Sequence, residues 1–253
     1  MSAPRQLLLI GIGAGDPDFL TMQAAAALNR ADVFFIHDKG RDKQALRALR
    51  TQICERFIKG RDYRMVAFDY PVRAKEFSDY KANVAGWHAA IEAIYTRLLR
   101  DELAEGQCGA FLIWGDPALY DSTLRIIEAI YARGDVAFDY EIIPGITAVQ
   151  ALAAKHRIAL NRIGEPVHIT TGRKLPAGAL EADSVVVMLD GEQAFTRIDP
   201  DTEIFWGAYL GTPDEVLIAG RLGDVRDRIV QTREAARQRI GWIMDTYLLR
   251  RAR

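Results

Sequence analysis

The chain has 253 residues, of which 49% are hydrophobic and 26% charged, an ordinary composition for a soluble globular protein of one or two domains. Its 33 basic and 34 acidic residues give a net charge of −1, which argues against nonspecific nucleic-acid binding. Cys54 and Cys108 lie far apart and predict neither a disulfide framework nor a metal site. Apolar stretches of at most about 8 residues are too short for a membrane span, and no signal peptide is evident. We therefore expect a cytoplasmic protein without a metal and without a membrane or nucleic-acid partner.

The first 160 residues predict strands that alternate with helices. Thr21 is a good N-cap for the first helix, and Trp87, Ile91, Ile94 and Leu98 form one apolar face of a long helix. The predicted strands are 6–12, 33–36, 63–70, 110–114 and 141–143, and the predicted helices are 21–30, 43–57, 79–103, 122–133 and one after Pro144-Gly145. This order predicts βαβ units, hence a mostly parallel sheet with helices on both faces.

The pattern of predicted strands and helices changes after residue 157. Strand candidates come at closer spacing, at 167–170, 185–189, 204–210, 216–219 and 242–248, with an arginine-rich helix at 225–239. This part predicts a mixed sheet. We place the boundary near 161–166, which divides the chain into an N-terminal α/β domain of residues 1–160 and a C-terminal mixed α/β domain of residues 161–253.

A glycine-rich turn, Gly11-Ile-Gly-Ala-Gly-Asp-Pro17, directly follows the first predicted strand. Glycines permit positive φ and a close approach of a ligand to the backbone. The dinucleotide fingerprint requires glycine at position 16, where this chain has Asp16, whose charge would repel a pyrophosphate. The spacing therefore argues against nicotinamide or flavin binding and leaves either another ligand or a tight turn capped by an acid.

Gly-Asp-Pro occurs twice, at 15–17 and again in Trp114-Gly-Asp-Pro-Ala-Leu-Tyr120, both times after a predicted strand. Ligands of open parallel sheets bind at this carboxyl edge. The alternative is a pair of unrelated type I turns, in which Asp-Pro is common.

Three further glycine turns follow strands, at 144–148, 187–191 and 209–215. In the first, Thr147 can cap a helix or present its hydroxyl to a ligand, and capping is the more common role. In the second, Met188 can fill the core or form a soft wall against an apolar or sulfur-bearing ligand.

The five turns, taken together and in this order, resemble the motifs of the tetrapyrrole methylase family over residues 6–225. The resemblance implies two α/β domains with a ligand cleft between them, a homodimer, and S-adenosylmethionine (SAM) as methyl donor, with S-adenosylhomocysteine (SAH) as its product. It also implies a small-molecule tetrapyrrole substrate. The sequence departs from the family pattern at Ala14, usually proline, and at Trp114, often glycine.

The resemblance places the SAM contacts on small residues for the most part, which suggests contacts through backbone atoms. These positions are Ala14, Gly115, Asp116, Leu119, Thr147, Ala148, Met188 and Gly211. Asp116 could accept a hydrogen bond from the ribose or the amino group, and Leu119 and Met188 could flank the methionine or the adenine.

Four other segments are most similar to the deacetylating members of the family, which methylate ring carbon one of precorrin-5 and release acetate in aerobic cobalamin synthesis. They are 37–40, 68–71, 80–84 with Trp87-His88, and 169–173. Methyl transfer chiefly requires orientation and desolvation, whereas acetate release is helped by a base.

Asp16, His37 and Asp38 are the candidate catalytic residues, although capping acids and surface histidines are common. The substrate is a polyacid, so we expect cations near it, with Arg173 and Lys174 the first candidates. Three alternatives stay open: another methylase of the same fold, acting on a different corrinoid intermediate, on diphthamide or on ribosomal RNA; a nicotinamide-dependent oxidoreductase; and a noncatalytic nucleotide-binding module.

Overall fold

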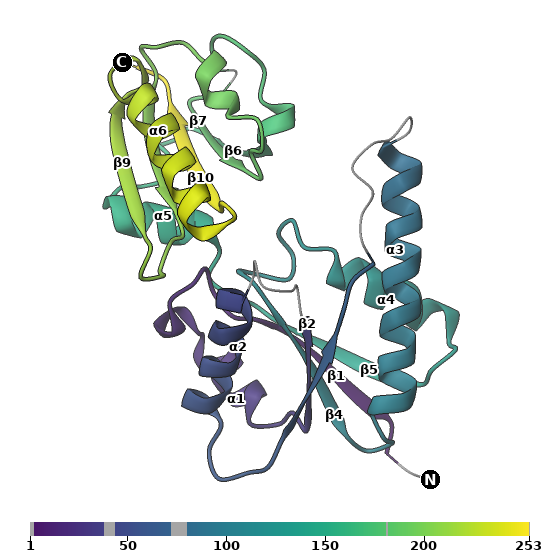
Figure 1. Cartoon of the computed structure of the whole chain (residues 1–253). Coiled ribbons are helices and arrows are strands. Elements are labelled where there is room, and N and C mark those ends of the chain that lie inside the picture. The colour runs from purple at the N-terminus through teal and green to yellow at the C-terminus, as the bar shows by residue number, and fades with distance from the viewer. Residues whose placement is uncertain (1–2, 38–43, 72–79, 181, 253) are drawn as a thin grey trace. The chain divides into compact units, whose positions relative to one another are not determined.

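The computed structural model describes residues 3–37, 44–71, 80–180 and 182–252 (Figure 1). Contacts divide the chain into two compact units. The first comprises Met1–Gly13 and Pro17–Ile146, and the second comprises Ala14–Asp16 and Thr147–Arg253. Each unit is described by itself.

The first unit is built on a sheet of five strands that are all parallel, in the order β3-β2-β4-β1-β5. The strands are β1 (Arg5–Gly11), β2 (Val33–His37), β3 (Arg64–Phe68), β4 (Cys108–Ile113) and β5 (Phe138–Ile143). The two central strands, β4 and β1, are almost wholly apolar and buried, as strands covered on both faces must be. The predicted parallel sheet is thereby confirmed.

Helices cover both faces of this sheet (Figure 1). Alternate residues of β1 show the division: Leu8 and Ile10 pack with helices α1 (Met22–Leu28) and α2 (Gln44–Phe57). Leu7 and Leu9 point to the other face, which carries α3 (Tyr80–Arg97) and α4 (Thr123–Arg133). As predicted, Thr21 caps α1, since its hydroxyl accepts a hydrogen bond from the Ala24 amide at 3.0 Å.

Two elements of the first unit differ from the prediction by three or more residues at one end. The helix expected to run to residue 103 is α-helical only to Arg97 and continues as a π-helical turn, η3 (Leu98–Glu102). Strand β5 begins at Phe138, three residues earlier than predicted, because it is an edge strand whose polar residues lie exposed between apolar ones. A short 3-10 helix, η1 (Pro17–Phe19), follows the first glycine turn.

The second unit contains a mixed sheet in the order β6-β7-β10-β8-β9. Only β6 and β7 pair in parallel, and the other neighbours are antiparallel. The strands are β6 (Val167–Thr171), β7 (Ser184–Met188), β8 (Glu203–Ala208), β9 (Val216–Arg221) and β10 (Asp245–Arg250), and the helices are α5 (Ala148–His156), α6 (Leu222–Ile240) and the short η4 (Gly172–Lys174) and η5 (Ala194–Arg197). The predicted mixed sheet is confirmed.

Helix α5 packs against β8 and β10, which is why contacts assign it to the second unit. Its Leu152 is fully buried, and His156 makes a 3.0 Å hydrogen bond to the Trp206 carbonyl of β8. The contacts thus divide the chain before α5. The predicted domain boundary at residue 160 concerns which parts of the chain fold independently, and it stays a prediction.

Candidate active site

The carboxyl edge of the first sheet has a topological switch point. Strands β1 and β4 are neighbours, but the helix after β1 packs on one face of the sheet and the helix after β4 packs on the other. Beyond their first residues, the loops that leave these two strands therefore lead to opposite faces of the sheet, and in open α/β sheets ligands bind where this happens. The two Gly-Asp-Pro turns are these two loops.

The two turns meet through backbone atoms. The Gly13 amide donates to the Gly115 carbonyl at 3.3 Å, and the Gly115 amide donates to the Gly13 carbonyl at 2.8 Å. The loop after β5 joins them, because a Cβ on Gly145 would lie 2.0 Å from the Gly115 oxygen and one on Gly11 would lie 2.6 Å from the Gly145 nitrogen. Only glycine allows backbones to approach this closely, so the three turns pack on one another through main-chain atoms.

Asp116 stabilises the same loops. One of its carboxylate oxygens accepts from the Gly145 amide at 2.9 Å and the other accepts from the Ala118 amide at 2.8 Å. A carboxylate has about four acceptor positions, so contact with a ligand hydroxyl or amine stays open to it. The structure thus gives Asp116 a role in holding the turn, beside the ligand contact that the resemblance implies.

Other predicted SAM contacts also carry local structural bonds. Ala14 is buried, with only 2% of its surface exposed. Thr147 caps α5 in a capping box with Gln150 and donates its amide to the Gln150 side chain at 2.9 Å. The Gly211 amide donates to the Glu215 carboxylate at 2.7 Å. Leu119, Ala148 and Met188 are partly exposed.

Of the three candidate catalytic residues, the structure describes two. Asp16 lies partly exposed in the first glycine turn and is grouped with the second unit. His37 ends β2, where its Nε2 accepts from the Tyr70 amide at 3.3 Å and its ring lies 3.8 Å from the Tyr70 ring. Asp38 falls outside the described residues. The structure therefore ties His37 to an aromatic cluster of the first unit.

Arg173 and Lys174 are exposed in η4, directly after β6. Lys174 also lines a small cavity of about 120 Å³ together with His168 and Thr170 of β6. These cations stay candidates for contact with substrate carboxylates.

The sequence analysis missed a partly buried polar cluster near the carboxyl edge of the first unit. Arg50 of α2 donates from Nε to the Leu112 carbonyl at 3.0 Å, and burial lowers its pKa. The hydroxyls of Tyr70 and Tyr95 are hydrogen bonded to each other, and burial raises the pKa of Tyr70 to about 12. The sequence held one clue, because Arg50 falls at helical spacing on the apolar stripe that includes Ile53 and Cys54.

Trp114 follows β4 at the start of the second Gly-Asp-Pro turn. Its indole Nε1 is buried and has no hydrogen-bond partner among the described residues. Buried donors in proteins are nearly always satisfied, so this one needs an explanation.

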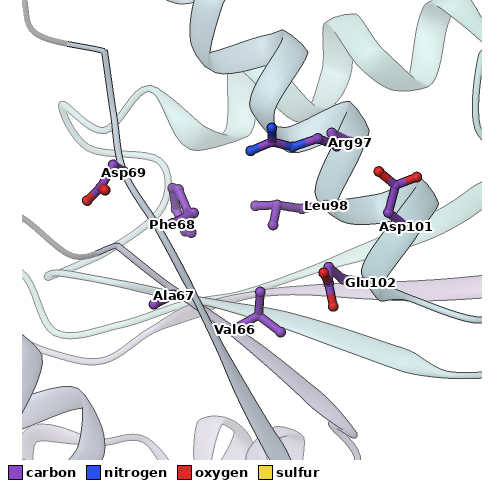
Figure 2. Close-up of a pocket in the computed structure, with 8 residues that line it drawn as sticks. All are labelled: Val66, Ala67, Phe68, Asp69, Arg97, Leu98, Asp101 and Glu102. Atoms are coloured by element: carbon purple, nitrogen blue, oxygen red, sulfur yellow. The ribbon is translucent and has the colours of Figure 1, made fainter.

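A separate cavity of about 390 Å³ lies beside the edge strand β3 (Figure 2). Its lining includes the apolar side chains of Val66 and Phe68 of β3 and Leu98 of η3, and the charged side chains of Arg97 and Asp101. Among the predicted site residues that the structure describes, none lines this cavity.

Cys54 and Cys108 are both buried free thiols, and burial raises their pKa values to about 12 and about 11. Within the described ranges, no group of three or more His, Cys, Asp and Glu residues could hold a metal ion. No helix of the described part is long and apolar enough to cross a membrane.

Comparison with known proteins agrees with this geometry. The family model for tetrapyrrole (corrin/porphyrin) methylases matches residues 6–226. A precorrin-6A synthase [deacetylating] from Sinorhizobium sp is 56% identical over 249 residues, which cover 98% of this chain and 95% of that protein.

The crystal structure of a cobalamin synthesis related protein (CobF) from Corynebacterium diphtheriae is 40% identical, with a TM-score of 0.83 and coverage of 98% of this chain and 99% of that one. A cobalt precorrin-4 methyltransferase, CbiF, is 19% identical with a TM-score of 0.62 over 96% of this chain and 94% of that one, and it shows the shared fold alone. The chain therefore belongs to the tetrapyrrole methylase family and is a SAM-dependent methyltransferase.

Proposed function

We propose that the enzyme transfers the SAM methyl group to ring carbon one of precorrin-5 and releases acetate, giving precorrin-6A in aerobic cobalamin synthesis. The observation that carries this proposal is the 56% identity to a deacetylating precorrin-6A synthase over 98% of the chain. Family members of other specificity are much less similar: a precorrin-2 C(20)-methyltransferase from the same source is 32% identical over only 57% of the chain.

The carboxyl edge of the first sheet has the chemistry that a SAM site needs. When bound, SAM supplies an electrophilic methyl group, whose transfer depends on alignment and exclusion of water. The close-packed turns at Gly11, Gly115 and Gly145 fix the backbone from which the predicted ligand-binding loops leave the sheet. The unpartnered indole N–H of Trp114 offers one more donor, which a bound ligand would satisfy.

The predicted SAM contacts at Ala14, Gly115, Asp116, Leu119, Thr147, Ala148, Met188 and Gly211 fit this picture. Since Asp116 and Thr147 already hold backbone groups in place, we infer that they act mainly by shaping the loops. Main-chain atoms of their neighbours then make most of the contacts.

Acetate release requires water to add to the acetyl carbonyl, after which the carbon–carbon bond breaks and its electron pair passes to the macrocycle. A base that removes a proton from the water would assist this step. We propose Asp16 for this role, because it is a carboxylate that lies partly exposed in the first glycine turn, and His37 is the second candidate. Arg173 and Lys174 are our candidates for pairing with substrate carboxylates.

We further propose that the enzyme works as a homodimer in the cytoplasm, as its family resemblance implies. Light scattering of the purified chain at micromolar concentration would measure its mass against the monomer mass of 28.3 kDa.

The proposal is tested by incubating the purified enzyme with precorrin-5 and methyl-labelled SAM. Mass spectrometry of the tetrapyrrole and an assay for acetate should show one added methyl group and one acetate released per turnover. Methylation of another corrinoid intermediate in preference to precorrin-5 would assign the enzyme to a different step.

A further inference from the structure

Leu189 has an unusual combination of backbone conformation and exposure. It directly follows β7, its φ is 52°, and 61% of its surface is exposed. We propose that Leu189 contacts the adenosine part of SAM, held in position by its buried neighbour Asp190. This inference rests on the proposed function, because that function supplies the ligand.

The left-handed conformation is unfavourable for a branched side chain, and such residues concentrate at functional sites. Five residues other than glycine adopt it in the described chain: Tyr120, Arg157, Leu189, Gln193 and Tyr209. Three of them, Tyr120, Leu189 and Tyr209, lie in glycine turns that the family resemblance links to SAM. Because most of these left-handed residues lie in the predicted SAM turns, we infer that the strained conformation of Leu189 has a role in ligand binding.

Leu189 lies between two fixed points. On one side, Met188 ends a strand that pairs with Thr171 of β6 and with Thr246 of β10. On the other side, Asp190 is 4% exposed and accepts hydrogen bonds through both its carboxylate and its carbonyl. The single residue between them has little freedom to relax.

Four hydrogen bonds hold Asp190. Its carboxylate accepts from the amides of Glu192 at 3.1 Å and Ala194 at 2.7 Å, and from the Tyr247 hydroxyl at 2.7 Å. Its carbonyl accepts from Arg233 Nη2 at 2.6 Å. The carboxylate also packs on Gly172, where a Cβ would lie 2.3 Å from Oδ1. Asp190 is therefore a positioning residue for the turn that contains Met188 and Leu189.

A second buried carboxylate fixes Arg233 in turn. The Arg233 Nε donates to Asp245 Oδ2 at 3.0 Å, and the same oxygen accepts from Trp206 Nε1 at 2.9 Å. Buried charges are costly unless they are paired and hydrogen bonded, as these are. This group, which we call the Asp190 network, consists of Asp190, Trp206, Arg233, Asp245 and Tyr247.

The exposed side chain of Leu189 is apolar. This property restricts which part of SAM it would contact. The methionine end of SAM carries charges that favour polar partners, whereas the adenine ring has a flat apolar face. Met188, the adjacent residue, is itself a predicted SAM contact. An exposed leucine at this point therefore suits the nucleoside.

The test measures SAH affinity by calorimetry for the wild type, Leu189→Gly and Leu189→Ala. Burial of a leucine side chain against a ligand is worth enough to predict about tenfold weaker binding in both variants. Leu189→Gly relieves the positive φ, so its melting temperature should equal or exceed that of the wild type. The KM for SAM should rise in both variants, while kcat changes less than about twofold.

Arg157→Gly is the matched control, because Arg157 has a φ of 57° and lies in the same unit, at the C-cap of α5. It should relieve the same backbone strain and leave SAH affinity unchanged. Unchanged affinity in both Leu189 variants would overturn the inference. Weakening in Leu189→Gly alone would overturn the side-chain contact, and a raised KM for the tetrapyrrole instead of SAM would overturn the nucleoside assignment. A wild-type protein that binds no SAH would instead contradict the proposed function itself.

Discussion

The two sheets hold their turns in different ways at two edges, which are the carboxyl edge of the first sheet and the edge of the second sheet where β7 ends. In the first unit, Gly11, Gly115 and Gly145 bring three backbones so close together that no side chain fits between them. In the second unit, the turn after β7 is held by the Asp190 network, which is made of buried side chains from distant parts of the chain.

The comparison shows two solutions to one problem, which is to fix a loop firmly enough to orient a ligand. The contacts among Gly11, Gly115 and Gly145 require no buried charge. They leave no room for a methyl group on Gly11 or Gly145. The side-chain network requires buried ions, each of which depends on its partners. The two edges should therefore fail in different ways when they are mutated.

The largest effect is expected from Arg233→Met. This substitution keeps the length of the side chain but leaves Asp245 without its counter-ion and the Asp190 carbonyl without its donor. Loss of one partner of a buried pair should lower the free energy of unfolding by about 3–5 kcal/mol, as measured in urea. The control is Arg237→Met on the exposed side of α6, which should change it by less than about 0.5 kcal/mol. A loss below about 1 kcal/mol in Arg233→Met would remove the distinction between the two edges.

Gly145→Ala tests the first edge. The added Cβ would lie 2.0 Å from the Gly115 oxygen, so the turns must move apart. We expect SAH affinity in calorimetry to fall by at least about a hundredfold and stability to fall by about 1–3 kcal/mol. Gly86→Ala in α3, where nothing lies within 4 Å of the new atom, should be neutral or stabilising. Wild-type affinity in Gly145→Ala would contradict the role of the glycine contacts.

Tyr70→Phe asks whether buried polar side chains also stabilise the first unit. Burial raises the pKa of Tyr70 to about 12, above its ordinary value of 10.0, so the folded state favours the protonated hydroxyl. The contribution of this preference to the free energy of unfolding is complete below pH 10. It is lost as the pH rises through 12, by up to about 2 kcal/mol. Relative to Tyr70→Phe, the wild type should lose stability over this range in urea titrations. If the free energies of unfolding of the wild type and Tyr70→Phe differed by the same amount at every pH, the raised pKa of Tyr70 would be contradicted.

Asp16→Asn is expected to have the smallest effect, expressed as a change in activation free energy, but it tests the proposed catalytic step most directly. If Asp16 is the base for acetate release, turnover of precorrin-5 should fall by at least about tenfold, with SAH affinity little changed. Turnover near the wild-type rate would exclude Asp16 from this role. The glycine turn would then act only by holding backbone groups.

The difference between the two edges also explains what the sequence could predict. The glycine turns are contiguous motifs after strands, so their place at a carboxyl edge follows from the alternation of strands and helices. The Asp190 network joins residues more than 40 positions apart, such as Asp190 and Arg233, and no local pattern indicates that they meet.

The errors in the predicted elements have local causes. The last strand was expected at 242–248 but runs over Asp245–Arg250, because the apolar Trp242 and Ile243 pack against the core from a turn after Gly241. The Tyr209 hydroxyl binds the Trp242 carbonyl at 2.5 Å, and the Tyr209 amide donates to the Met244 carbonyl at 2.9 Å. Hydrophobicity alone does not distinguish an irregular segment that packs against the core from a buried strand.

The central claim is that the switch point between β1 and β4 is part of the SAM site. A crystal structure of the enzyme with SAH tests it most directly. We predict SAH at the carboxyl edge of the first sheet, in contact with main-chain atoms of Gly115 and with the Trp114 Nε1 hydrogen bonded. SAH bound instead in the cavity beside β3, against Phe68 and Leu98, would contradict the account.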